Sequence, residues 1–374
     1  MRSIYIGIFL SLVLIFISSA HYLVFRSFGV FFPGLLDSVS KKWLFSVILL
    51  MSTGFIFSSV SVHWYENMFT RAFYLLSGSW LGIFSNIFWS TILLLILYNI
   101  LNLLKVNLTS FSYVVAGVYS IMFFISIQGL WIVEHPVIKN IDVFISNLPK
   151  DWEGKKIAQL SDVHLGIVHR EDYLQKIVDK VNKQNVDMVV ITGDFFDGMD
   201  GRLEHLAYPL NRLKTTLGIF YVTGNHETYL GTNKTNLILE KESGVRHLKN
   251  EAITINGLNL IGIDYPEQGQ KINLVEEVKK LTTKDPAILL FHEPKNVEEL
   301  AKLGKIDLML SGHTHYGQIW PYNFIAKFVY GKYVYGLSLV NNMTQYTSSG
   351  VGTWGPPMRL GTKSEIPIFT LYRK

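Results

Sequence analysis

Four long stretches without a charged side chain constrain the fold of this 374-residue chain more than any other feature. No Asp, Glu, Lys or Arg occurs in the runs Ser3–Phe25, Trp43–Val62, Ala72–Leu104 and Val106–Val133. Each run can cross a hydrocarbon core of about 30 Å as a helix of roughly 20 residues. We therefore predict four transmembrane helices, since four such runs in succession would be unusual for the core helices of a soluble domain. A cleaved signal peptide would explain only the first run.

Charge separates this N-terminal part from the rest of the chain. Residues 1–133 carry six Lys or Arg and two acidic residues, whereas the remainder carries 28 basic and 27 acidic residues. Nucleic-acid enzymes usually have a strong basic excess, so no nucleic-acid partner is predicted. Basic residues flank the two sides of the predicted spans in equal number, and the positive-inside rule therefore does not orient the chain. We expect an integral protein of the cell membrane, with its second domain on either face and its oligomeric state open.

Short apolar runs alternate with helical patterns after His135. A linker with one strand-like stretch occupies 134–154, and EDYLQKIVDKVNKQ (171–184) has the periodicity of an amphipathic helix. Six further runs are predicted to be buried strands: 155–161, 187–192, 218–223, 258–263, 286–291 and 306–311. This alternation predicts an α/β domain with a largely parallel or mixed sheet over 155–374, after an all-α domain at 1–133.

Polar motifs follow five of these strands. They are Asp162-Val163-His164, Gly193-Asp194-Phe195-Phe196-Asp197, Gly224-Asn225-His226-Glu227, His292-Glu293-Pro294 and Gly312-His313-Thr314-His315. Open α/β sheets bind ligands at the carboxyl ends of their strands. We therefore expect the five motifs to form one site.

The residue types in these motifs favour metal binding. Asp, Asn and His suit borderline or hard divalent cations, and the absence of cysteine excludes thiolate ligands. In extended backbone, residues i and i+2 face the same way, so Asp162 can chelate with His164, and His313 with His315. Their Cα atoms would then be roughly 6.5 Å apart, which suits two cations separated by about 3.5–4 Å. The flanking glycines allow the backbone to turn close to the site.

In this order, the motifs D-x-H, G-D-x-x-D, G-N-H-E, H-E-P and G-H-T-H resemble the calcineurin-like metallophosphoesterase family. The resemblance extends from about Lys155 to Leu371, and H-E-P together with the tail 350–371 is similar to a bacterial branch that is often membrane-attached. It implies a four-layer sandwich, with two mixed β-sheets flanked by helices, and a dinuclear metal centre at the strand ends.

Site roles also follow from the resemblance. It implies that Asp162, His164 and His315 hold one metal, that Asn225, His292 and His313 hold the other, and that Asp194 bridges them. Asp197 would orient His226, which would stabilise or protonate the leaving oxygen. The two metals would lower the pKa of water enough to supply hydroxide near neutral pH. The ligand set admits Mn, Fe, Zn or Ni.

Several residues near the motifs receive other interpretations. Tyr316 stands where many relatives have a small residue and is expected to narrow the substrate entrance, whereas Asp264 has no assigned role. The run Gly350–Gly355 fits G-x-G-x-x-G, but Pro356-Pro357 forbid the helix that a nucleotide site needs. It is predicted to be a structural or substrate-side loop. Four other residues are expected at the surface or in structural roles: Arg359, in an exposed ion pair, and His169, His205 and His247.

The sequence therefore predicts a membrane-anchored, metal-dependent phosphoesterase. Its substrate would be a phosphomonoester, phosphodiester or pyrophosphate, and the spans make a lipid-linked phosphate attractive. One alternative is a membrane sensor or scaffold whose metal domain binds a phosphorylated ligand without turnover. A transporter with an accessory enzyme is a weaker alternative, because the spans carry no Asp, Glu, Lys or Arg.

Overall fold

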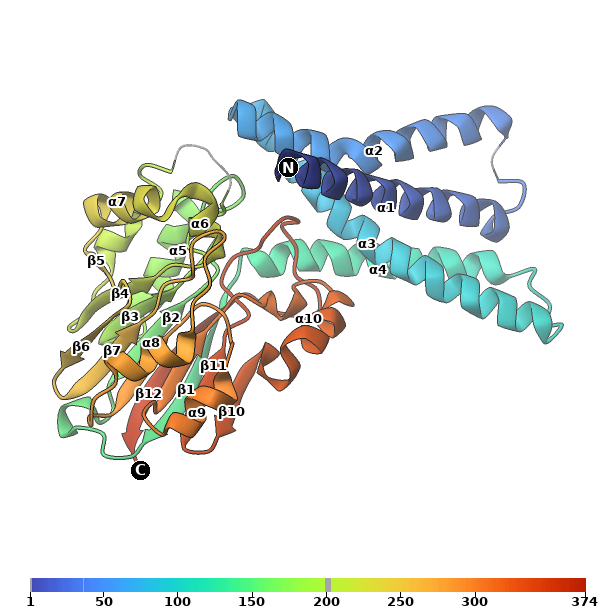
Figure 1. The fold of residues 1–374 in the computed structure, drawn as a ribbon. Helices are drawn as coiled ribbons and strands as arrows, with labels where there is room; N and C mark the ends of the chain where they lie inside the picture. The colour runs from blue at the N-terminus through green and yellow to red at the C-terminus, as the bar shows by residue number, and fades with distance from the viewer. Residues whose placement is uncertain (1, 36, 199–202) are drawn as a thin grey trace. The chain divides into compact units, whose positions relative to one another are not determined.

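A computed structural model describes residues 2–35, 37–198 and 203–374 of the chain (Figure 1). The predicted domains also include residues 1, 36 and 199–202, which lie outside the described residues. The chain divides into two compact units. One contains Met1–Trp131 together with Gly355–Met358, and the other contains Ile132–Trp354 together with Arg359–Lys374.

Four helices form the first unit: α1 (Arg2–Phe31), α2 (Ser38–Trp64), α3 (Met68–Leu103) and α4 (Phe111–Val133). They occupy the four uncharged runs, and α1, α2 and α3 extend beyond them. Within the described residues, all four are long and apolar enough to cross a membrane, and α3 is 36 residues long. The number of candidate spans therefore agrees with the prediction from the sequence.

Polar side chains link neighbouring helices of this unit. Ser58 Oγ and Ser77 Oγ lie 2.6 Å apart between α2 and α3. Asn86 Nδ2 donates to Ser126 Oγ at 2.7 Å between α3 and α4. The same nitrogen lies 3.8 Å from the Sδ of Met358, in the segment Gly355–Met358 that belongs to this unit. Such bonds between small polar side chains stabilise helix association where no water is available.

Two six-stranded mixed sheets form the second unit. The strand order is β1-β12-β2-β3-β4-β5 in the first sheet and β10-β11-β9-β8-β7-β6 in the second. The first sheet consists of β1 (Val137–Ile145), β12 (Glu365–Arg373), β2 (Lys156–Leu160), β3 (Met188–Thr192), β4 (Gly218–Val222) and β5 (Val245–His247). The second consists of β10 (Gly336–Val340), β11 (Met343–Thr347), β9 (Leu308–Ser311), β8 (Ala287–Leu290), β7 (Leu258–Gly262) and β6 (Glu251–Ile255).

Helices cover the outer faces of the two sheets (Figure 1). The helices over these faces are α5 (Glu171–Asn182), α7 (Thr232–Glu242), α8 (Leu274–Leu281) and α9 (Val297–Leu303). The unit also contains α6 (Asn225–Leu230), α10 (Tyr322–Tyr330) and the short 3-10 turns η1 (Lys150–Trp152), η2 (Tyr208–Arg212), η3 (His315–Gly317) and η4 (Gly331–Val334). One apolar core lies between the first sheet and α5, a second between the sheets, and a third between the second sheet and α8 and α9. The predicted four-layer sandwich is therefore confirmed.

Burial on both faces explains why these strands appear in the sequence as continuous apolar runs. All residues of β3 and of β7 are buried, because helices cover one side of each sheet and the other sheet covers the opposite side. The strands β2, β3 and β4 are parallel neighbours, as are β8 and β9. Their carboxyl ends therefore lie at one end of each sheet, where the five polar motifs are found.

Candidate metal centre

The loops after β2, β3, β4, β8 and β9 bring the predicted ligands together. Among the described residues, three groups of histidine and carboxylate atoms are close enough to hold a metal ion. They are Asp162 with His164 and His315, His164 with Asp194 and His226, and Asp194 with His292 and His313; the ligand atoms in each group lie within 4.8 Å of one another. Residues more than 150 positions apart in the chain thus meet at one centre.

The first group joins the end of β2 to the loop after β9. His164 Nε2 lies 3.0 Å from His315 Nε2, and His315 Nε2 lies 3.3 Å from Asp162 Oδ1. Asp162 also accepts the backbone N–H of His313 at 3.0 Å, which holds the two loops together. The three side chains present nitrogen and oxygen lone pairs toward a common point.

The second ligand group, His292, His313 and Asn225, comes from the loops after β4, β8 and β9 and lies beside Asp194. His292 Nε2 lies 3.0 Å from Asp194 Oδ2, 3.1 Å from His313 Nδ1 and 3.2 Å from Asn225 Oδ1. The other ring nitrogen, Nδ1, bonds to the carbonyl of Thr192 at 2.8 Å. Because a carbonyl only accepts, Nδ1 carries the proton and Nε2 is left with a lone pair for a metal.

Asp194 lies between the two groups. Its Oδ2 is 3.0 Å from His292 Nε2 in the second group and 3.9 Å from His164 Nε2 in the first. Its Oδ1 accepts the backbone N–H of His226 at 2.9 Å, which fixes the carboxylate. One oxygen of Asp194 therefore faces both groups, as a bridging ligand must.

The chemistry of this donor set fits a pair of divalent cations. Pairs of imidazole nitrogens stand within about 3 Å of each other and of a carboxylate, inside a buried cluster. Each neutral imidazole carries only one N–H, so these rings cannot donate a hydrogen bond to every nitrogen and oxygen lone pair in the cluster. A cation shared among the lone pairs satisfies them together.

Burial and the Asp194 charge set the protonation of the histidines. Burial lowers the pKa of His313 to about 4 and holds that of His164 well below its usual range, which favours the neutral form that binds metals. Burial also lowers the pKa of His292, but the Asp194 carboxylate outweighs this effect, and the net pKa rises to about 10. The field at His292 therefore favours positive charge, which a cation supplies as well as a proton does.

The ligand loops have unusual backbone geometry. Asp162, His164, Asp194, His313 and His315 all have positive φ, between 48° and 71°. L-residues with side chains rarely adopt this left-handed region, and it is concentrated at functional sites. The expectation that extended backbone aligns residues i and i+2 was therefore wrong in its geometry, because left-handed turns aim these side chains at the centre.

His226 is the second residue of helix α6, which follows β4. Its Nδ1 bonds to the backbone carbonyl of Asp197, and its Nε2 lies 4.0 Å from Asp194 Oδ2. The contact from Asp197 thus comes from its main chain and not from its carboxylate. The carboxylate instead has Oδ1 3.9 Å from His164 Nδ1, and burial together with Asp194 raises its pKa well above the usual value.

Glu227 supports the site without facing it. Its carboxylate accepts backbone N–H groups from Asp194 at 2.9 Å, Phe196 at 3.0 Å and Gly224 at 2.7 Å. Burial and the nearby Asp194 raise its pKa to about 7. Glu227 therefore ties the β3 loop to the β4 loop.

Arg359 has a role that the sequence did not predict. Its side chain is completely buried, so the expected exposed ion pair is wrong. The guanidinium donates to the carbonyls of Ser349 at 2.6 Å and Gly352 at 2.7 Å, and to the carbonyl of His315 at 3.3 Å. It joins the loop after β11 to a candidate metal ligand. That loop includes most of the G-x-G-x-x-G run, and the N–H of Gly352 bonds to the carbonyl of Asp162 at 2.8 Å.

The remaining predicted residues lie outside the two ligand groups. His169 is buried and bonds to Thr353 Oγ1 at 3.0 Å. His247 pairs with Asp264 at 2.9 Å, and Asp264 accepts the N–H of Thr223 at 3.0 Å. His205 is exposed, and its backbone N–H bonds to Glu242. Tyr316 stacks on Tyr335 with ring centroids 4.7 Å apart.

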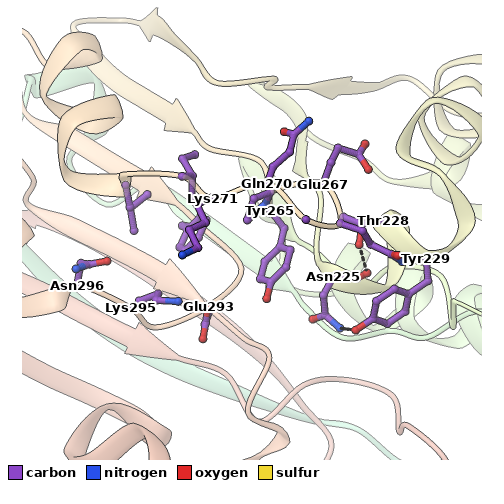
Figure 2. A pocket seen from close by; sticks show the side chains of 16 residues that line it. Asn225, Thr228, Tyr229, Tyr265, Glu267, Gln270, Lys271, Glu293, Lys295 and Asn296 are labelled. Carbon is purple, nitrogen blue, oxygen red and sulfur yellow. Dashed lines mark hydrogen bonds and ion pairs between the residues drawn. The ribbon is translucent and has the colours of Figure 1, made fainter. Parts of the chain in front are cut away.

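A pocket of about 470 Å³ opens beside the second ligand group (Figure 2). The candidate ligand Asn225 lines it, and its Nδ2 donates to Tyr229 OH at 3.2 Å. Tyr265 stands in the pocket and stacks on His313, with ring centroids 6.3 Å apart. Lys271 and Lys295 also line the pocket. Its lining combines aromatic and basic groups with two acidic ones, Glu267 and Glu293, and suits the part of a substrate that extends beyond a phosphate.

Known proteins with similar sequences define the family. A family model described as calcineurin-like phosphoesterase matches residues 155–317. An uncharacterized metallophosphoesterase of Aquifex aeolicus is 36% identical, covering 61% of this chain and 88% of that protein. The chain therefore belongs to the calcineurin-like phosphoesterase family, and the resemblance seen in the motifs is confirmed.

Two further relatives are similar to this chain. An uncharacterized metallophosphoesterase of Helicobacter pylori is 38% identical, covering 64% of this chain and 65% of that protein. A protein of Danio rerio named as a transmembrane protein with a metallophosphoesterase domain is 33% identical, covering 64% of this chain and 58% of that protein. The match thus spans just under two thirds of the Helicobacter pylori relative.

Proposed function

We propose that this chain is a membrane-anchored phosphoesterase that hydrolyses a phosphomonoester, phosphodiester or pyrophosphate at a dinuclear metal centre. The observation that carries the proposal is the position of Asp194 Oδ2, 3.0 Å from His292 Nε2 and 3.9 Å from His164 Nε2. Residues 1–133 are the membrane domain, 134–154 the linker and first strand, and 155–374 the catalytic domain. The family and the four candidate spans support this division of labour.

The proposed ligands form two sets that share Asp194. One set is Asp162, His164 and His315, and the other is Asn225, His292 and His313. Bound divalent cations would supply positive charge for the phosphate oxygens and lower the pKa of water enough to make hydroxide available near neutral pH. The metal is Mn, Fe, Zn or Ni, since nitrogen and oxygen donors suit each of these.

His226 is the proposed general acid. Its Nδ1–H is held by the backbone carbonyl of Asp197, so the ring is fixed with Nε2 on the side of Asp194. In the protonated ring, Nε2 gives its proton to the leaving oxygen as the phosphorus–oxygen bond breaks. The ring is left neutral, with its Nδ1–H still on the carbonyl.

The pocket beside Asn225 is the proposed binding site for the rest of the substrate. Tyr265 offers a ring face there, and Lys271 offers positive charge for a second phosphate or another acidic group, whereas Lys295 lies 3.5 Å from the carboxylate of Glu293. In a chain with four candidate membrane spans, lipid-linked phosphates and phospholipid head groups are the substrates that this arrangement favours.

The test is hydrolysis by the full chain, purified in detergent micelles and loaded with Mn²⁺. The probes are p-nitrophenyl phosphate and bis(p-nitrophenyl) phosphate. We expect His226→Ala to lower kcat by roughly 10²–10⁴-fold and Asp194→Asn to abolish metal-dependent activity. The matched control is Glu240→Gln, at an exposed position on α7. Unchanged turnover in both site variants would reject the mechanism, whereas phosphate binding without any product release would favour the sensor or scaffold.

A further inference from the structure

Helix α10 has an apolar face that the described residues of its own unit leave uncovered. Phe324 is 61% exposed, Ile325 60%, Phe328 91% and Val329 63%. No residue of this nine-residue helix is buried. These four positions recur at the spacing i, i+1, i+4 and i+5, which places them along one side of a helix. A soluble domain normally turns such a side toward its core, so an exposed apolar surface of this kind indicates a contact with another molecule or with lipid.

The opposite side of α10 packs toward the candidate metal centre. Tyr330 has its ring centroid 5.9 Å from that of His313, and a side chain at Gly317 would meet the backbone of Asn323. The N–H of Tyr322 bonds to the carbonyl of Ile319 at 2.8 Å. The helix is therefore held directly against the loop that carries two of the proposed ligands.

The turn after α10 is held against the same loop. Thr314 Oγ1 donates to the carbonyl of Val334 at 2.6 Å, and Tyr316 stacks on Tyr335 with ring centroids 4.7 Å apart. Both ends of the segment 322–335 are thus anchored to residues 314–319. Whatever the apolar side of α10 rests on is brought close to the proposed ligands.

We propose that the apolar side of α10 inserts into the surface of the lipid bilayer and presents the metal centre to phosphate groups of membrane lipids. A bilayer is available to this helix, because four helices of the same chain are long and apolar enough to cross one. The exposed Lys327 on the same helix suits the phosphates of the interface, where long basic side chains extend toward lipid head groups. Large apolar side chains on one side of a short helix are typical of interfacial segments.

The proposal rests on the proposed function and specifies its substrate class as phosphate esters of membrane lipids. A phosphate at the interface then reaches the centre without leaving the bilayer. A soluble protein or a second copy of the chain would cover this face without using the four candidate spans. The labelling test below distinguishes such a protein contact from contact with lipid.

The test uses the absence of cysteine in the chain. Phe328→Cys and, as matched control, Leu237→Cys each give one site for a bimane label on the full protein in nanodiscs of phosphatidylcholine and phosphatidylglycerol. Leu237 is an exposed apolar side chain, 54% accessible, on α7 of the same unit. Each label is measured with plain lipids and with lipids brominated on the acyl chains.

We expect bromination to lower bimane emission roughly two-fold or more at position 328, since interfacial helices lie about 5–10 Å deep, and to leave position 237 unchanged. Equal emission at 328 in both lipids overturns the proposal. A blue-shifted but unquenched label at 328 also overturns it, because protein would then cover the helix.

Hydrolysis separates this proposal from the proposed function. The double variant Phe324→Gln/Phe328→Gln should keep full activity on bis(p-nitrophenyl) phosphate in solution. Its rate of hydrolysis of phosphatidic acid in nanodiscs should fall by about ten-fold, because the contact with the bilayer interface is lost. Leu237→Gln is the control. If the wild type hydrolyses neither probe, the proposed function fails while lipid quenching still decides the bilayer contact.

Discussion

The carboxylate of Glu227 holds Asp194 through the backbone: Oε2 accepts the N–H of Asp194 at 2.9 Å. The same oxygen accepts the N–H of Gly224 at 2.7 Å, and Oε1 accepts that of Phe196 at 3.0 Å. Asp194 faces both candidate ligand groups, so the position of its carboxylate depends on this contact. Groups that orient metal ligands in this way are worth about 10–100-fold in metal affinity.

Glu227→Gln is therefore expected to weaken metal binding. The amide NH₂ of glutamine cannot accept a hydrogen bond, so at least one buried N–H loses its partner, at a cost of about 1–3 kcal/mol in the free energy of unfolding. We expect Mn²⁺ affinity to fall by about 10–100-fold, measured as bound metal per chain after dialysis. Activity should recover at high Mn²⁺.

The control for this variant is Glu240→Gln, which changes an exposed glutamate on α7. It should leave both metal content and thermal stability unchanged. A Glu227→Gln protein with normal Mn²⁺ affinity and lower stability alone would show that the residue supports the fold and not the metal centre.

The glycine before His313 is a second test of the centre's packing. A Cβ at Gly312 would overlap Ser161 Oγ and the Asp162 carboxylate. Gly312→Ala should therefore displace Asp162 and lower bound Mn²⁺ by at least about ten-fold. Gly244→Ala is the matched control, since a Cβ there meets nothing within 4 Å. Equal metal content in the two variants would contradict the packing argument.

The location of the site could be predicted because each ligand directly follows a buried strand. Strands covered on both faces are continuous apolar runs, so β2, β3, β4, β8 and β9 were visible in the sequence, and Asp162, Asp194 and His292 could be located at their ends. The resemblance carried by the motifs predicted the remaining ligands and the four-layer sandwich.

Other features depend on contacts between distant residues. Nothing near Arg359 in the sequence indicates that carbonyls from residues 315 and 349–352 surround its guanidinium. Local propensity disfavours the left-handed backbone of Asp162 and His164, which the assembled loops impose. The exposure of Phe328 is equally invisible, because an apolar helical face ordinarily predicts burial.

The pocket beside Asn225 leads to a prediction about substrate choice. Lys271 lines this pocket and is exposed to an incoming ligand. Lys271→Ala should lower kcat/KM for a diphosphate diester by about ten-fold, equivalent to about 1.4 kcal/mol, mainly by raising KM. The value for bis(p-nitrophenyl) phosphate should change less than about two-fold, because that probe has no second phosphate.

Lys241→Ala, on the exposed surface of α7, is the control for general charge effects. If it matches Lys271→Ala on both substrates, the effect arises from the overall field and not from the pocket. A uniform loss on both substrates in Lys271→Ala alone would place the lysine at the phosphate under attack.

The acid sensitivity of the second unit should depend on His169. Burial, with a smaller contribution from Arg359, lowers the pKa of His169 from 6.5 to about 3. Between these values the unfolded chain binds the proton and the folded chain does not, so stability falls as pH drops below 6.5. The loss is at most about 1.4 kcal/mol per pH unit.

His169→Gln removes this proton uptake, so its apparent Tm in detergent micelles should fall less than that of the wild type between pH 7.5 and 5.5. The control is His205→Gln, at an exposed histidine, and it should follow the wild type. Equal falls in Tm for all three proteins would show that His169 does not govern the acid response.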